Sequence, residues 1–390
     1  MAKSASSYSI SKRADGRFVA KFIVDGKTTA VYGKTKTEVT AKLKAKLAAV
    51  EQAKAAQLTN FMEADKMTVE NWAYICLETY SKVSVRETTY TNYKSLADHH
   101  LFPLGKYKLS EVTNAMVQDH LQREARKPGK EDGLGEKSLT NLKAFLNLIF
   151  NQAVRNGYIM RNPVTGVKIP KAGKKETIAL TVEQQHALLK AAREYPKPIM
   201  FAVVFASYTG CRKGEVMGLQ WKDVDFEEGV IHISKQFNRR PSIDDPSGKK
   251  SEMKVTAPKT KSSVRDIYMF PSFKKEFEEY KQKMIEWKAE RRFVHSEEDF
   301  VFVGEKNRPI EPRVFYDYYQ EIMEQAGIED ANFHTLRHTF ATRCIENGMD
   351  ILMVAKTLGH SNVSTTLNKY SHLLPQHQKA SMEKLEAIYF

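Results

Sequence analysis

Apolar residues recur every three or four positions through three separate stretches, and this spacing constrains the fold more than any other feature. The residues that mark the stripes are Val39, Leu43, Leu47 and Val50; Val69, Trp72, Ile75, Cys76 and Tyr80; and Leu139, Leu142, Leu146, Ile149 and Ala153. Such spacing places side chains on one face of a helix, and that face must be buried against a neighbour. The sequence therefore predicts a mainly helical chain, long enough for about two to three domains.

The first 60 residues are predicted to form a small β-sheet packed on a helix. Residues 17–24 and 28–32 alternate as strands do, and Asp25-Gly26 between them suits a tight turn. The helix follows, from Thr37 to about Gln57. Residues 1–60 as a whole hold twelve Lys and Arg against four Asp and Glu. This excess of positive charge attracts nucleic-acid phosphates. A basic surface that only aids solubility is the alternative.

Residues 67–165 are predicted to be helical, with Ser138 as the N-cap of one helix and Gly157 as its stop. Residues 166–178 mix Lys with Pro and Gly and are typical of a linker. The next domain opens at Thr181-Val-Glu-Gln184, which has the spacing of a capping box. Within it, residues 230–234 and 263–269 are predicted to pair as a hairpin around a long polar insert.

Membrane and disulfide-rich classes are disfavoured. No apolar run reaches the ~18 residues of a membrane span, and the N-terminus has no export signal. The three cysteines, Cys76, Cys211 and Cys344, are too few and too scattered for a disulfide framework or a zinc cluster. We therefore expect a cytoplasmic location and no membrane partner.

Four segments of the last domain concentrate residues that can act on a phosphate. In the first, Gly210 can end a helix, and Arg212 then stands at the junction before the next. A junction arginine can bond two phosphate oxygens with its planar fork, and Glu215 can hold that fork in place. A buried structural ion pair between the two side chains is the alternative.

The second segment is His334-Thr-Leu-Arg-His338, whose spacing brings both histidines and Arg337 together on a helix. Thr335 stands where a zinc-binding HExxH helix has glutamate, and no third ligand follows, so an oxyanion such as phosphate fits better than zinc.

The third segment, 257–265, holds Lys259 and Lys261 at the tip of the predicted hairpin. A lysine on a mobile turn can reach a DNA groove and deliver a proton, although solvated charge is the default for such residues.

The fourth segment begins at Leu358. Gly359 can terminate a helix over 351–358 with His360 just beyond it, and Tyr370 falls on a second helix over about 364–373. Because Leu367 and Tyr370 are three residues apart on that helix, a buried core tyrosine fits the pattern as well as a reactive one.

The order of these segments (Arg, Lys, His-x-x-Arg, Gly-His, Tyr) resembles the tyrosine recombinases, and within them the integrases of temperate phages and conjugative transposons. The matching residues are TGCRKGEVMGLQWKDVDF at 209–226, PKTKSSVRDI at 258–267, HTLRH at 334–338 and LGHSNVSTTLNKY at 358–370. The resemblance is specific over about 180–390, and it is looser over the helical middle.

The resemblance implies a multidomain, mainly α fold. Residues 1–60 resemble the arm-type DNA-binding domain that some integrases carry, a small sheet-plus-helix module. Residues 67–165 resemble the helical, SAM-like domain that binds core sites, and 166–178 link it to a catalytic domain at 179–390. That catalytic domain is expected to be mostly α with a small antiparallel sheet.

The resemblance also implies a role for each site residue. Tyr370 is the nucleophile on the scissile phosphate, Arg212 and Arg337 clamp its non-bridging oxygens, and Glu215 supports Arg212. His334 and His360 assist by hydrogen bonding and proton transfer, and Lys259 protonates the leaving 5′ oxygen, with Lys261 as its alternative. His338 lies outside the family's core set and is given a structural role.

The implied function is site-specific recombination that integrates and excises a mobile element, such as a prophage, through a covalent 3′-phosphotyrosyl intermediate. Partners would be double-stranded DNA at core and arm sites, further copies in a homotetramer, and accessory DNA-bending and excision factors. The stretch 381–390 would dock on a neighbouring subunit or in cis. Two arginines supply the charge that a metal would bring, and the covalent intermediate conserves bond energy, so no cofactor, metal or ATP is expected.

Two rival functions use part of the same pattern. A type IB topoisomerase shares the chemistry, but a basic N-terminal arm module favours recombination. A DNA-binding regulator that no longer cuts is disfavoured because all six catalytic positions are filled: Arg212, Lys259, His334, Arg337, His360 and Tyr370.

Overall fold

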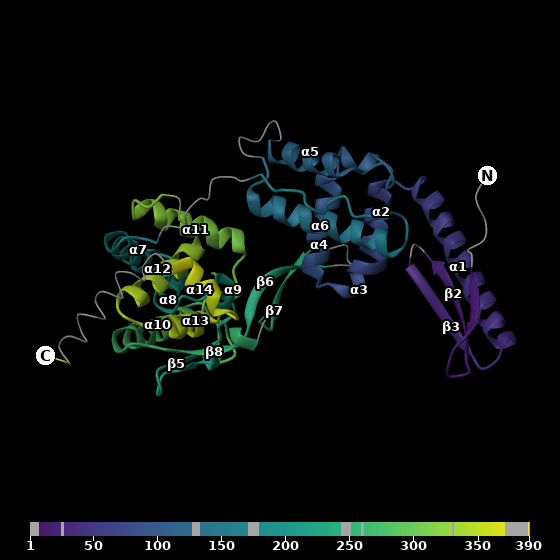
Figure 1. The fold of residues 1–390 in the computed structure, drawn as a ribbon. Coiled ribbons are helices and arrows are strands. Elements are labelled where there is room, and N and C mark those ends of the chain that lie inside the picture. Colours follow the sequence, from purple (N-terminus) through teal and green to yellow (C-terminus); the bar gives the residue numbers. More distant parts are fainter. Residues whose placement is uncertain are drawn as a thin grey trace. The chain divides into compact units, whose positions relative to one another are not determined.

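Two units divide the chain, Met1–Gly173 and Lys174–Phe390, and each is described by itself (Figure 1). The computed structural model describes residues 8–24, 27–126, 133–170, 179–242, 251–258, 261–329, 331–370 and 389. Within these ranges helices dominate both units, and the strands form three small antiparallel sheets. The mainly α architecture is therefore confirmed, whereas the domain boundaries stay predictions.

The N-terminal sheet packs one face on a long helix. Its strands pair antiparallel in chain order, and the elements are β1 (Ser9–Lys12), β2 (Phe18–Val24), β3 (Lys27–Gly33) and α1 (Lys36–Ala64). Ala20 and Phe22 of β2 are buried against Val39 of α1. Lys21 and Ile23 alternate with them and are exposed, so the strand has the two-sided pattern that its sequence predicted.

Two details of this module differ from expectation. The structure adds β1, and α1 continues past the predicted end near Gln57. The predicted turn at Asp25-Gly26 lies outside the described residues, although the strands on either side pair in the register that a hairpin requires.

The rest of the first unit is helical, as predicted for 67–165. Its elements are α2 (Val69–Cys76), a π-helical turn (Leu77–Ser81), α3 (Lys82–Ser84), α4 (Glu87–His100), a 3-10 turn (Leu104–Lys106), α5 (Asn114–Ala125) and α6 (Glu136–Arg155). The stripe predicted on α6 is buried in full.

Two of the finer predictions in this unit are wrong. The N-cap of α6 is Gly135 rather than Ser138, because the helix begins two residues before that serine. Ile75 is 41% exposed, since it lies one position off the buried face that Trp72 and Cys76 share. Gly157 does follow the helix end at positive φ, as expected of a stop signal.

The second unit surrounds one almost entirely buried helix, α8 (Phe201–Thr209). The other helices are α7 (Val182–Glu194), α9 (Lys213–Gly218), α10 (Pro271–Glu290), α11 (Pro312–Gln325), α12 (Phe333–Glu346), α13 (Ile351–Leu358) and α14 (Val363–Tyr370). The predicted capping box at the start of α7 is confirmed: Gln184 N donates to Thr181 Oγ1 over 3.1 Å, and Thr181 N donates to Gln184 Oε1 over 3.0 Å.

Strands of the second unit form two separate antiparallel sheets. One has the order β4 (Val224–Asp225), β5 (Val230–Ile233), β8 (Arg265–Tyr268), and the other pairs β6 (Gln236–Pro241) with β7 (Ser251–Thr256). The predicted pairing of 230–234 with 263–269 is confirmed by the register Val230↔Tyr268. The insert was not expected to contain strands, but it pairs with itself as β6 and β7. The described residues 257–258 and 261–264 therefore lie between β7 and β8, beside the Gln236↔Thr256 end of the ladder, whereas Lys259 lies outside the described residues.

We predict that Gly210→Ala destabilises the chain much more than Gly327→Ala. Both glycines have left-handed backbone, with φ of +63° and +65°, which costs an L-residue about 1–2 kcal/mol. A Cβ at Gly210 would also lie 2.5 Å from Cδ1 of Phe340, whereas no described atom lies within 4 Å of one at Gly327. Urea unfolding of the two variants measures the difference, and equal losses would contradict the close packing at Gly210.

Candidate active site

A cavity of about 790 Å³ in the second unit gathers basic and imidazole side chains from three distant segments. Arg212 comes from the α8–α9 junction, His334 and Arg337 from the start of α12, and His360 from the residue pair that follows α13. Lys213, Arg239 and Arg240 add further positive charge to its lining. Four of the six predicted catalytic residues therefore share one cavity, and Glu215 lines it with them.

Arg212 is positioned by two helix ends. α8 stops at Thr209 because Gly210 adopts the left-handed conformation, and Arg212 is then the N-cap of α9. Its backbone N donates to Oε2 of Glu215 over 2.9 Å, and its Nη1 donates to Oε1 of the same carboxylate over 2.7 Å. The carboxylate is buried while 37% of the Arg212 side chain stays exposed, so the guanidinium is fixed at one edge and accessible to a ligand.

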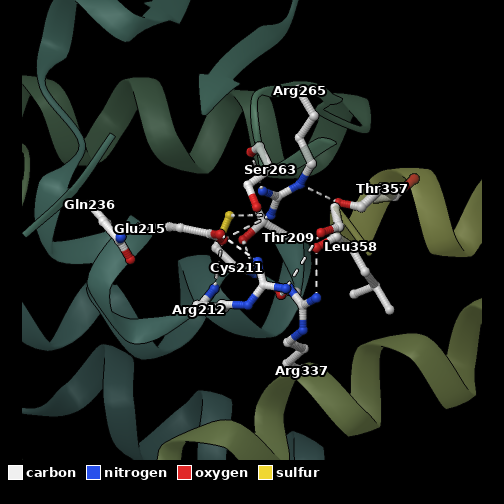
Figure 2. Close-up of polar contacts among 12 residues, drawn as sticks. Thr209, Cys211, Arg212, Glu215, Gln236, Ser263, Arg265, Arg337, Thr357 and Leu358 are labelled. Atoms are coloured by element: carbon white, nitrogen blue, oxygen red, sulfur yellow. Dashed lines mark hydrogen bonds and ion pairs between the residues drawn. The ribbon is translucent and has the colours of Figure 1, made fainter. Parts of the chain in front are cut away.

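Arg337 is nearly fully buried and binds the carbonyl ends of two helices. Its Nη1 donates to the carbonyl of Gly210 over 2.9 Å, and its Nη2 donates to that of Leu358 over 2.6 Å (Figure 2). Burial, and next the nearby charge of Arg212, lowers the pKa of Arg337 to about 10. The group is still charged at neutral pH, and an anion in the cavity would relieve the repulsion between the two arginines.

His334 and His360 are uncharged at neutral pH. Burial, and then the charge of Arg337, lowers the pKa of each to about 4. His334 lies one turn before Arg337 on α12, and Nδ1 of His360 is 2.6 Å from Oγ1 of Thr366. A neutral imidazole has one N–H and one acceptor nitrogen, so each ring can either donate to a phosphate or accept a proton.

Tyr370 is buried and does not line this cavity. Its ring packs with Ala341, Ile345, Val354 and Leu358, and burial raises its pKa to about 12. The structure therefore places the predicted nucleophile in an apolar cluster, as the alternative interpretation of a core tyrosine expected.

The hydroxyl of Tyr370 is held by a histidine, since its Oη lies 3.0 Å from Nδ1 of His338. Nε2 of that ring lies 2.5 Å from Nζ of Lys369. Burial first, and then the charge of Lys369, lowers the pKa of His338 to about 3, so the ring is neutral. Because an ammonium only donates, Lys369 donates to Nε2 and the ring proton on Nδ1 donates to the phenol oxygen.

The lysine prediction stays open. Lys259 lies outside the described residues, and Lys261 is described only as the start of a 3-10 turn, Lys261–Ser263, that leads into β8. Glu215 is placed as predicted, against Arg212.

Two contacts of the site were missed by sequence reasoning. Arg265 donates to Glu215, yet it drew no role although it stands in the matching stretch 258–267. The alternation of side chains along a strand could have revealed it, because Arg265 lies on the same inward face of β8 as buried Ile267. The bond between His338 and Tyr370 joins residues 32 positions apart, which no local pattern reveals.

Two negative findings apply to the part of the chain that the structure describes. No three His, Cys, Asp or Glu side chains gather there in a way that could hold a metal ion. No helix there combines the length and the apolar character needed to cross a bilayer.

The sequence matches two protein families. The Phage integrase family matches residues 179–377, and the family described as Phage integrase, N-terminal SAM-like domain, matches 68–124. A tyrosine recombinase XerC-like protein of Caldanaerobacter subterraneus is 27% identical, over 92% of this chain and 91% of its own length. The ICEBs1 integrase of Bacillus subtilis is also 27% identical, over 79% of this chain and 80% of its own length.

Solved structures share the fold. The Tn1549 transposon integrase in complex with transposon right end DNA has a TM-score of 0.66 and 25% identity, covering 82% of this chain and all (100%) of that chain. A lambda integrase tetramer bound to a Holliday junction has a TM-score of 0.53 at 17% identity, over 90% of this chain and 95% of that one.

We predict that Tyr370→Phe lowers the free energy of unfolding by about 1 kcal/mol, because it leaves the buried N–H of His338 without its acceptor. The matched control is Tyr319→Phe, since the Tyr319 hydroxyl is buried and has no hydrogen-bond partner among the described residues. Its removal should leave stability unchanged or raise it, because a buried hydroxyl without a partner costs free energy in the folded state. Urea unfolding compares the two, and equal effects would argue against the His338 bond.

Proposed function

This chain belongs to the phage integrase family, and from that premise we propose that Tyr370, with the residues of the basic cavity, cuts and rejoins DNA. The chain is a site-specific recombinase that integrates and excises a mobile element, such as a prophage or a conjugative transposon. The observation that carries the assignment of residues is the convergence of Arg212, Arg337, His334 and His360 on one cavity.

Cleavage is a transesterification in which one bond forms as another breaks. The oxygen of Tyr370 attacks the scissile phosphorus, the bond from phosphorus to the 5′ oxygen breaks, and the phosphate stays joined to the tyrosine at the 3′ end. A 5′ hydroxyl of the partner strand then attacks the phosphotyrosine and releases the enzyme. The energy of the phosphodiester is conserved at each step, so strand exchange needs no ATP.

Proton transfers accompany both steps. The phenol proton passes to His334 or His360, which are neutral in this structure and whose pKa a bound phosphate would raise. Lys259 or Lys261 gives a proton to the leaving 5′ oxygen. With these groups in place the chemistry requires no cofactor and no metal.

Arg212 and Arg337 provide most of the electrostatic stabilisation of the negative charge that builds on the phosphate in the transition state. Arg337 is fixed by two carbonyls and Arg212 by Glu215, so neither side chain has to be ordered when charge builds on the phosphate. Such preorganised donors stabilise a transition state by roughly 3 kcal/mol each.

Tyr370 has to leave His338 before it can react, because its hydroxyl is buried outside the cavity. It is the last described residue of α14, so a shift of this short helix is the simplest route. We therefore interpret the described state as one that precedes cleavage.

Double-stranded DNA is the proposed partner, with residues 1–60 on arm sites, 67–165 on core sites, 166–178 as the linker and 179–390 as the catalytic domain. The Tn1549 integrase in complex with DNA and the lambda integrase tetramer on a Holliday junction support DNA binding and assembly as a homotetramer. Accessory DNA-bending and excision factors belong to the same proposal, as does a location on DNA in the bacterial cytoplasm. The docking stretch at 381–390 lies, apart from Tyr389, outside the described residues and stays a prediction.

A type IB topoisomerase is the rival with the same chemistry. It would relax supercoiled DNA as a monomer and without a particular site, so a relaxation assay on DNA that lacks attachment sites separates the two functions.

We predict that the chain forms a covalent adduct with a nicked suicide substrate that carries its attachment site, and that Tyr370→Phe abolishes the adduct. Arg212→Ala should slow adduct formation about 100-fold or more, as the loss of one oxyanion donor does. Denaturing electrophoresis of labelled DNA measures both rates.

Tyr316→Phe, at a half-exposed tyrosine of α11, is the matched control and should form the adduct at the wild-type rate. Two results would sink the mechanism: no wild-type adduct on any candidate attachment site, or an adduct that persists in Tyr370→Phe.

A further inference from the structure

We propose that Arg265 is a positioning residue for DNA cleavage, one that frees the charge of Arg212 for the phosphate by sharing Glu215 with it. This inference rests on the function proposed above. Arg265 does not line the cavity that holds Arg212 and Arg337; it lines a neighbouring cavity of about 960 Å³. It therefore acts through the residues it contacts.

Arg265 is a buried arginine with all of its nitrogens engaged. Nη2 donates to Oε2 of Glu215 over 3.0 Å and approaches Sγ of Cys211 at 3.6 Å, while Nη1 donates to the carbonyl of Ser263 over 3.1 Å. Nε donates to the carbonyl of Thr357 over 2.5 Å. Figure 2 shows Arg265 and Arg212 reaching the same carboxylate, that of Glu215.

Glu215 is held between two arginines. Its Oε1 accepts from Nη1 of Arg212 and its Oε2 from Nη2 of Arg265, and only 3% of its side chain is exposed. Burial alone would raise the pKa of this carboxyl, but the two arginines outweigh burial and lower it. Glu215 is therefore ionised, and a buried carboxylate paired with a single arginine would cancel that arginine's charge. With two arginines to one carboxylate, a net positive charge is left at Arg212.

Arg265 also joins the two segments that carry the candidate proton-transfer residues Lys261 and His360. Ser263 ends the 3-10 turn that begins at Lys261, and Thr357 lies in the last turn of α13, three residues before His360. A Cβ on Gly359 would lie 3.1 Å from Nη1 of Arg265 and 3.1 Å from the carbonyl of Ser262, so the turn and the helix end pack directly on each other. Loss of the guanidinium would release both.

The test is a double-mutant cycle on Arg265 and Glu215. Single-turnover cleavage of the suicide substrate is measured for wild type, Arg265→Gln, Glu215→Gln and the double variant, with DNA affinity followed by fluorescence anisotropy. We expect Arg265→Gln to slow cleavage about 10- to 100-fold, as loss of a supporting contact does. DNA affinity should change by less than about threefold, because the residue does not line the cavity.

Rescue distinguishes positioning by charge from simple loss of structure. Without Arg265, the full charge of Glu215 falls on Arg212, so removing that charge in the double variant should make cleavage faster than in Arg265→Gln alone. If the two substitutions only caused independent losses of structure, their fold-reductions in cleavage rate would instead multiply. A double variant that is no faster than Arg265→Gln overturns the proposal.

Arg343→Gln is the matched control. Arg343 is another partly buried arginine of the same unit that ties Leu180, Gln185 and Glu346 together, away from the catalytic cavity. It should cleave at the wild-type rate at a temperature where it is folded. Arg265→Lys keeps the charge without the fork and should cleave at an intermediate rate; it replaces Arg265→Gln in the cycle if thermal unfolding shows that variant to be unfolded.

Failure of this inference differs from failure of the proposed function. If wild type forms no adduct, the recombinase mechanism itself is wrong. If wild type cleaves and Arg265→Gln cleaves equally fast, only the role of Arg265 is overturned.

Discussion

Three consecutive carbonyls at the end of α13 accept hydrogen bonds from three different arginines, and the site depends on this arrangement. Thr357 binds Arg265, Leu358 binds Arg337, and Gly359 binds Arg212, the last over a longer 3.5 Å. The last carbonyls of a helix have no partner within it and carry partial negative charge, so they attract cations. The helix end thereby gathers three guanidiniums that would otherwise repel one another.

This gathering leaves more positive charge than the protein neutralises. Among the residues that the structure describes, Glu215 is the only carboxylate that these three arginines bind, so two positive charges remain. The lowered pKa of Arg337 reflects this excess of positive charge, since burial and then the charge of Arg212 disfavour its cationic form. A phosphate in the cavity would offset that repulsion, and the site is therefore complementary to an anion before any DNA arrives.

Local sequence signals predicted much of this, and non-local contacts explain the rest. Gly210, Gly359 and the Thr181 capping box act within one turn of the chain, so their structural roles were readable from spacing alone. The prediction of Ser138 as an N-cap was wrong, because several neighbouring residues compete to set where a helix begins and α6 begins at Glu136. The partners of Arg265 come from segments about 50 and 92 residues away, and a single sequence carries no sign of which distant groups will meet.

Tyr370 shows why its pattern fitted two interpretations at once. In the described state its oxygen accepts from His338 within an apolar cluster, and burial holds its pKa near 12. At neutral pH a phenol with that pKa is ionised in about one molecule in 100,000, so it is a poor nucleophile where it lies. The basic cavity, which Tyr370 does not line, holds the cations that favour a phenolate. If Tyr370 is the nucleophile, it packs in the apolar cluster before cleavage and becomes reactive only in the basic cavity. Movement from the cluster to the cavity then couples cleavage to the arrival of DNA.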